Sequence, residues 1–194
     1  MMNIGIYFYD NAEVLDFAGP FEVFSTAKRL GADHWNVSLI AQESTVIARG
    51  GFTVQADFTL ANAPALDVLV VVGGVHTEEL KKPPVLDWIA RTSSKTQLTA
   101  SVCTGVFLLA EAGVVTHQQV TTHWEDIPDL KSTYPALNVL EKQRWVEDGA
   151  IVTSGGISSG IDMSLFLVSK LASRELAEKT ATQMEYRWKN SAAL

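Results

Sequence analysis

The feature that most restricts the fold is an apolar run at residues 67–72, Asp-Val-Leu-Val-Val-Val, which ends at Gly73 and Gly74. A run of this kind, almost uniformly apolar and rich in β-branched side chains, is typical of a central parallel strand that helices cover on both faces. The sequence therefore predicts an α/β protein built around a mostly parallel sheet.

Segments of strand and helix character alternate along the rest of the chain. Strands are predicted at 3–8, 36–40, 67–72, 97–102 and 150–154, with short antiparallel strands within 45–58. Helices are predicted from Pro20 to a stop at Gly31, and at 84–94, 106–112, 159–173 and 175–189. Such alternation implies helices on both faces of the sheet. Because 194 residues suit one domain and no linker interrupts the pattern, a single domain over 1–194 is expected.

The net charge and the number of cysteines limit which classes of partner and which cellular compartment are expected. A formal net charge of -7 argues against nucleic acid or an anionic membrane as the main partner. With one cysteine, no disulfide can form within the chain. No stretch approaches the ~20 apolar residues that a membrane span needs, and no basic leader precedes the first strand. A soluble cytoplasmic protein is the expectation.

The strongest local signal is Ser101-Val102-Cys103-Thr104-Gly105. It has the form S-x-C-x-G, a version of the sharp strand-to-helix turn that presents a nucleophile. This turn would expose Cys103 at the carboxyl end of the sheet, where α/β proteins bind ligands. The N-terminus of the following helix is expected to stabilise a thiolate there. A small buried core cysteine is the structural alternative, and this pentapeptide alone does not decide between them.

Two further segments would face the sulfur if the strands are ordered as usual. Gly73 and Gly74 end the neighbouring strand, and the Gly74 N–H could stabilise developing negative charge, although a plain turn also explains two glycines. Asp16 lies at the carboxyl end of the first strand, just before the helix expected from Pro20. It is either a helix-entry residue or a buried, protonated acid beside the sulfur of Cys103. In the second case it could serve as general acid and then as base.

The remaining polar candidates carry weaker signals. His123 lies in Thr121-Thr122-His123-Trp124, which suggests a pocket lip, although a lone histidine is more often structural. Trp124 itself could line a pocket or belong to the core or to a dimer contact. No histidine has metal-ligand spacing with Cys103, so no metal site is predicted and no cofactor is required. Residues 155–160, Gly-Gly-Ile-Ser-Ser-Gly, lack the phosphate-loop lysine and favour a packing turn.

Taken together, these segments resemble the ThiJ/PfpI superfamily, which has a class I glutamine-amidotransferase-like fold. The resemblance covers nearly the whole chain in the expected order and is closest to the isonitrile hydratase branch. The matching segments are Leu15-Asp16-Phe17-Ala18-Gly19-Pro20, Val72-Gly73-Gly74, Ser101-Val102-Cys103-Thr104-Gly105, Thr121-Thr122-His123-Trp124, Gly155-Gly156-Ile157-Ser158-Ser159-Gly160-Ile161-Asp162 and Gln183-Met184-Glu185-Tyr186.

The resemblance implies a flavodoxin-like three-layer sandwich that forms a homodimer, with Cys103 as nucleophile and Asp16 as its acidic partner. Thr104 matches a residue that the hydratase branch uses, whereas protease-like members carry a histidine at that position. His123 matches a histidine near the cysteine in deglycase-like members, which have Glu where this chain has Asp16. Some relatives are transcriptional regulators with a C-terminal helix-turn-helix module. That module is expected to be absent, since the chain ends soon after Lys189.

The first functional hypothesis is hydration of an isonitrile, R–NC, to the N-substituted formamide. Cys103 would add to the isonitrile carbon to give a thioimidate, and Asp16 would supply the proton and then help to activate water. Thr104, Gly74 and His123 would position the substrate or the water, so the expected partner is a small molecule. The alternatives are glyoxalase- or deglycase-like action on reactive carbonyls, a non-enzymatic redox-sensing or ligand-binding module, and an inert relative.

Overall fold

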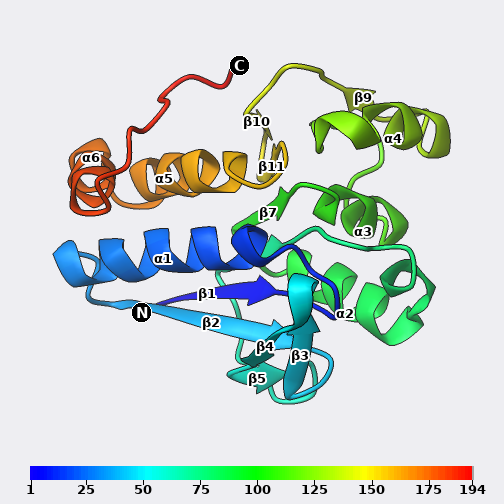
Figure 1. Cartoon of the computed structure of the whole chain (residues 1–194), viewed down its shortest axis with the longest axis horizontal. Coiled ribbons are helices and arrows are strands. Elements are labelled where there is room, and N and C mark those ends of the chain that lie inside the picture. Colours follow the sequence, from blue (N-terminus) through cyan, green and yellow to red (C-terminus); the bar gives the residue numbers. More distant parts are fainter. Residues whose placement is uncertain (194) are drawn as a thin grey trace.

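The computed structural model describes residues 1–193 and contains a seven-stranded sheet between two layers of helices (Figure 1). The strand order is β10-β11-β7-β6-β1-β2-β5, and only the β10–β11 pair is antiparallel. The strands of this sheet are β1 (Met2–Tyr7), β2 (Trp35–Ala41), β5 (Phe58–Thr59), β6 (Val68–Val71), β7 (Leu98–Val102), β10 (Trp145–Asp148) and β11 (Ile151–Ser154). Two small pairs stand apart from it, β3 (Thr45–Ala48) with β4 (Phe52–Gln55), and β8 (Gln119–Val120) with β9 (Asn138–Val139).

The helices form the outer layers. They are α1 (Val14–Leu30), α2 (Pro83–Ser93), α3 (Gly105–Glu111), α4 (Ile127–Thr133), α5 (Ser159–Leu171) and α6 (Arg174–Gln183). Helices α1, α5 and α6 pack against one another, whereas α2 and α3 pack together elsewhere on the sheet (Figure 1). The predicted mostly parallel sheet with helices on both faces is therefore confirmed. Within residues 1–193, no helix combines the length and the apolar character needed to cross a membrane.

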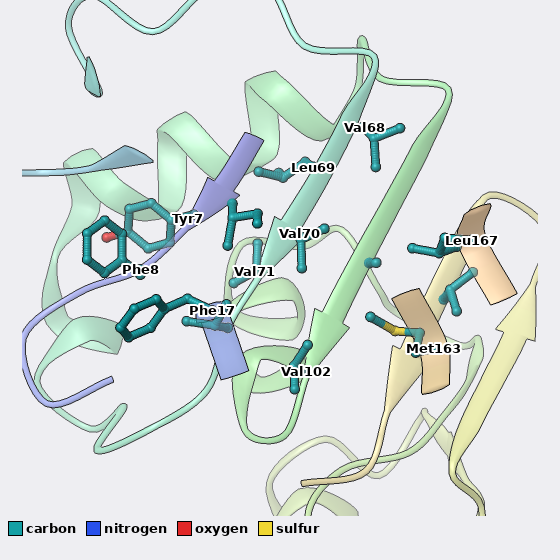
Figure 2. Close-up of a cluster of buried hydrophobic side chains, with 14 of the residues drawn as sticks. Tyr7, Phe8, Phe17, Val68, Leu69, Val70, Val71, Val102, Met163 and Leu167 are labelled. Carbon is teal, nitrogen blue, oxygen red and sulfur yellow. The ribbon is translucent and has the colours of Figure 1, made fainter. Parts of the chain in front are cut away.

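The centre of the core is strand β6, the apolar run from which the fold was predicted. All four of its residues, Val68–Val71, are fully buried. Phe17 of α1 and Met163 of α5 lie in the same cluster of buried side chains as these four residues (Figure 2). Full burial stabilises each such side chain by about 1.5–3 kcal/mol, and it needs apolar residues at every position of the strand rather than at alternate ones.

The first helix begins earlier than the sequence predicted. It begins at Val14, so Pro20 lies inside the helix rather than at its start. An internal proline removes one hydrogen bond and usually costs about 3 kcal/mol, whereas a proline at the first helical position costs little, so the sequence favours a helix start at Pro20. Here the preceding turn is fixed by tertiary contacts, since Phe17 packs in the core and Gly73 binds Asp16. Because the helix begins at Val14, Asp16 lies in the first turn of α1 and not at the helix entry.

The last helix ends earlier than predicted, at Gln183 instead of Lys189. The chain after it binds the side of α5. The Trp188 indole N–H donates to the Asp162 carbonyl at 3.2 Å, and the Lys189 N–H donates to the Asp162 carboxylate at 3.0 Å. These contacts replace the helical turns that amphipathic spacing alone suggested. The other predicted strands and helices are confirmed to within a few residues, whereas β10, α4 and the β8–β9 pair were not predicted.

Gly105→Ala is expected to destabilise the fold by about 1–3 kcal/mol, although alanine normally favours a helix over glycine by ~1 kcal/mol. The reason is that a Cβ at position 105 would lie 2.2 Å from the Val71 carbonyl oxygen, which belongs to rigid backbone of β6. Urea unfolding would measure the change. A rise in the free energy of unfolding would contradict this close approach.

Candidate active site

Cys103 lies on a strained turn between β7 and α3. Its φ of 54° is in the left-handed region, which is uncommon for a residue other than glycine. Two hydrogen bonds fix the turn: the Cys103 N–H donates to the Ser154 carbonyl at 3.2 Å, and the Thr122 hydroxyl donates to the Cys103 carbonyl at 2.8 Å. The sharp turn predicted from the S-x-C-x-G pattern is thus present.

The two glycines after β6 pack directly against this turn. A Cβ at Gly73 would lie 2.5 Å from the Thr104 nitrogen and 2.8 Å from the Cys103 Cβ, so no larger residue fits. The Gly74 N–H donates to the Thr104 hydroxyl at 3.0 Å, and that hydroxyl donates to the Gly74 carbonyl at 3.1 Å. The Gly74 N–H is therefore engaged by Thr104, which it helps to orient, instead of facing the sulfur as expected.

Asp16 is fully buried behind the nucleophile turn. Its Oδ2 accepts a hydrogen bond from the Gly73 N–H at 3.2 Å, and its Oδ1 accepts none from residues 1–193. The carboxyl group therefore binds the end of β6 and does not cap its own helix. Burial raises the pKa of Asp16 to about 7, although the Gly73 N–H acts in the opposite direction.

Burial acts on the Cys103 thiol as well. It raises the pKa of the thiol well above its usual range, and the neighbouring Asp16 charge raises it further. Burial therefore disfavours the charged form of both groups: the predicted rise in the pKa of Asp16 is present, whereas the surroundings of Cys103 do not favour the predicted thiolate. The Thr104 N–H does lower the thiol pKa, but burial outweighs it.

A cavity of about 440 Å³ opens over the sulfur. Cys103 is only 7% exposed, yet it lines this cavity, so it is reachable by a small molecule. The lining residues are Glu13, Arg49, Gly74, Val75, His76, Thr77, Cys103, Thr104, His123, Glu125, Asp126 and Ile157. The structure therefore brings together four of the five predicted site residues at the cavity, with Asp16 buried behind them.

His123 forms part of the cavity wall. Its Nε2 lies 3.6 Å from a carboxylate oxygen of Glu125, and its ring packs on Gly156. A Cβ at position 156 would lie 2.1 Å from Nδ1 of His123, which explains one glycine of the 155–160 segment as a packing requirement. Among residues 1–193, no group of three or more His, Cys, Asp or Glu side chains is arranged to hold a metal ion.

Sequence reasoning missed several residues in or near the site, among them Asp126, Ile157 and Tyr9. Burial raises the pKa of Asp126, which lines the cavity. Ile157 lines it as well, with a φ of 55°. Tyr9 is buried, and its hydroxyl has no hydrogen-bond partner within residues 1–193. Burial raises its pKa, and the charges of Glu79, Asp16 and Cys103 raise it further. Tyr9 follows β1, so the rule that ligands bind beyond the carboxyl ends of strands could have found it.

Thr104→Val is expected to cost about 1–3 kcal/mol of stability, since it keeps the shape of the side chain but leaves the Gly74 N–H without its acceptor. Thr104→Ser keeps the hydroxyl and serves as the control. Urea unfolding of both variants would measure the difference. Equal stability of the valine and serine variants would mean that the Thr104–Gly74 pair does not hold this end of β6.

The family of the chain follows from three comparisons. The family model described as DJ-1/PfpI matches residues 2–170. An isonitrile hydratase from Pseudomonas putida is 32% identical over 95% of this chain and 78% of that protein. The HTH-type transcriptional regulator CdhR from Pseudomonas aeruginosa is 30% identical over 88% of this chain, which spans only 51% of the regulator.

A solved structure agrees with the sequence comparisons. A ThiJ/PfpI family protein from Pseudomonas syringae has a TM-score of 0.86 and 25% identity, over 95% of this chain and 75% of that one. The predicted flavodoxin-like three-layer arrangement is thereby confirmed. The family model covers residues 2–170, which include the turn at Cys103 and the two glycines after β6. The chain belongs to the DJ-1/PfpI family.

Proposed function

We propose that the chain hydrates isonitriles to N-substituted formamides, with Cys103 as the nucleophile. The observation that carries the proposal is a thiol that lines a cavity, with a buried carboxyl group, that of Asp16, bound to the Gly73 backbone that packs against the same turn. An isonitrile carbon must gain both a proton and a nucleophile, and this pair supplies both without changing its own net charge. The 32% identity to an isonitrile hydratase supports the same reaction.

The proposed reaction has two stages, formation of a thioimidate on Cys103 and its hydrolysis. The Asp16 carboxylate takes the thiol proton while the sulfur lone pair forms a bond to the isonitrile carbon, and Asp16 passes that proton to the same carbon. The product is the thioimidate Cys103–S–CH=N–R. Water then adds to this carbon, Asp16 assists the proton transfers, and the carbon–sulfur bond breaks. The formamide R–NH–CHO leaves, and Cys103 is again a protonated thiol.

The neighbouring groups have positioning roles in this scheme. The Thr104 hydroxyl, held by Gly74, is placed to orient the attacking water or the substrate nitrogen. His123 and Asp126 line the cavity and provide hydrogen-bonding groups near the site of water addition. The raised thiol pKa fits this scheme, because Asp16 removes the thiol proton only when the electrophile is present.

The direct test supplies the purified protein with ethyl isonitrile and, separately, with methylglyoxal. We expect N-ethylformamide, observed by proton NMR, and no consumption of methylglyoxal beyond the buffer rate. Consumption of methylglyoxal without formation of formamide would favour the glyoxalase- or deglycase-like alternative and would rule out the proposed reaction as the main activity.

A ligand-binding module without turnover is the second candidate. It is favoured by the raised pKa of Cys103, since a thiol is a much weaker nucleophile than a thiolate. The 30% identity to the regulator CdhR is consistent with it. Under this alternative, small ligands would raise the melting temperature of the protein, and neither compound would be converted.

A further inference from the structure

A second hollow of about 540 Å³ adjoins the cavity over Cys103. The two share His123 and Ile157, so a ligand bonded to the sulfur could extend past these side chains into the second hollow. Its lining residues are Thr121, Thr122, His123, Trp124, Ile127, Pro128, Glu141, Lys142, Gln143, Arg144, Gly155, Gly156, Ile157, Ser158 and Ser159. Both volumes lie in the range of small-molecule sites.

The two hollows differ in chemical character. The one over Cys103 carries acidic and imidazole side chains, whereas the exposed surface of the second is mostly apolar. Two of the three Lys, Arg and Glu side chains of the second hollow are already paired: Arg144 binds the buried Asp162, and Glu141 binds Lys131 at 2.6 Å. The third is Lys142. Most of the surface that remains for a ligand is carbon, and Trp124 is 72% exposed.

Ile157 occupies an unusual position at the junction of the two hollows. It is β-branched, yet its φ of 55° is in the left-handed region, and its side chain is 38% exposed. Strain of this kind persists only where the surrounding structure enforces it, and it is concentrated at functional sites. Ile157 lines both hollows, so this one residue connects the space over Cys103 with the second hollow.

We propose that the second hollow binds the apolar substituent R of the substrate, so that the protein prefers isonitriles with an alkyl or aryl group of several carbons. This inference rests on the proposed function for its choice of substrate. Burial of each methylene in the transition state raises kcat/KM by about fourfold. The preference should therefore increase steadily from methyl to hexyl isonitrile while the substituent finds room.

Ser158→Trp places a large side chain at an exposed position of the second hollow, outside the cavity over Cys103. We expect it to reduce the hexyl-to-methyl ratio of kcat/KM at least tenfold. Trp124→Ala removes an exposed part of the wall and should lower the ratio as well. Ser44→Trp, at an exposed position outside both hollows, is the matched control and should leave the ratio unchanged.

A second readout separates this inference from the proposed reaction. N-methylmaleimide and N-hexylmaleimide form a carbon–sulfur bond with Cys103, the single cysteine, and intact mass reports the rates. Glutathione provides the reference for intrinsic reactivity. We expect the hexyl reagent to react faster with the wild type than with Ser158→Trp.

The combined outcomes are distinct. A hexyl preference for maleimides without formamide production supports the second hollow and removes the proposed reaction. Formamide production with a flat chain-length series, or with the same series in Ser158→Trp, overturns the hollow's role and leaves the reaction in place. If the protein forms no formamide and also shows no chain-length preference in labelling, both the proposed reaction and the role of the second hollow are overturned.

Discussion

Replacement of Cys103 by alanine or serine is expected to abolish formamide production, with a loss on the order of 10³-fold or more in kcat. Without the sulfur, no thioimidate forms, and neither side chain can replace the thiol as a nucleophile of comparable strength. The measurement is formamide production by NMR at saturating ethyl isonitrile. Because the side chain of Cys103 is small and lies on a fixed turn, both variants should fold.

The control for this loss of activity is whether the Cys103→Ala variant still folds and still binds ethyl isonitrile. Circular dichroism should be unchanged, and ethyl isonitrile should still raise the melting temperature of Cys103→Ala if the cavity remains intact. A variant that retains more than about a tenth of the wild-type kcat would show that the sulfur is not the nucleophile. The site would then act by general acid–base chemistry alone.

Asp16→Asn is expected to lower kcat by about 10²–10⁴-fold, the usual contribution of a general acid–base group, and to stabilise the protein at alkaline pH. The amide keeps an acceptor for the Gly73 N–H but cannot take the thiol proton. The measurements are formamide production and urea unfolding at several pH values. Loss of activity combined with a gain in stability would identify a carboxyl group retained for chemistry.

The sign of the stability effect follows from the pKa of Asp16. Its folded value of about 7 lies above its ordinary value of 3.8, so between these pH values the folded state holds a proton that the unfolded state has released. The free energy of unfolding of the wild type therefore falls as pH rises from 4 to 7. At pH 8 this contribution reaches about 4 kcal/mol.

Asp16→Asn removes this pH-dependent loss of stability, because the asparagine side chain does not ionise. The variant should match the wild type near pH 4 and exceed its stability increasingly up to pH 8. Parallel pH profiles for the wild type and Asp16→Asn would mean that Asp16 is not buried as an acid of raised pKa.

The sequence by itself determined the layers of the fold and predicted the turn that carries the candidate nucleophile, Cys103. The apolar run at 67–72 favoured a strand with both faces covered, because burial of apolar side chains on both faces is what stabilises such a run. The turn at Cys103 was equally local, since small residues on both sides of it allow the close backbone approach seen at Gly105. The homodimer and the cytoplasmic location stay predictions.

Only the tertiary structure decided how deeply Cys103 and Asp16 are buried and which residues form the hollow beside them. The pKa values of Cys103 and Asp16 depend on burial by segments far away along the chain, which no local pattern encodes. The internal position of Pro20 in α1 also depends on tertiary contacts, because packing of Phe17 in the core outweighs the local cost of the proline. The second hollow joins residues from 121–128 with residues from 141–144 and 155–159, and their meeting is set by the arrangement of helices and strands. Local backbone preferences act over a few residues, whereas desolvation and cavity shape depend on everything that packs nearby.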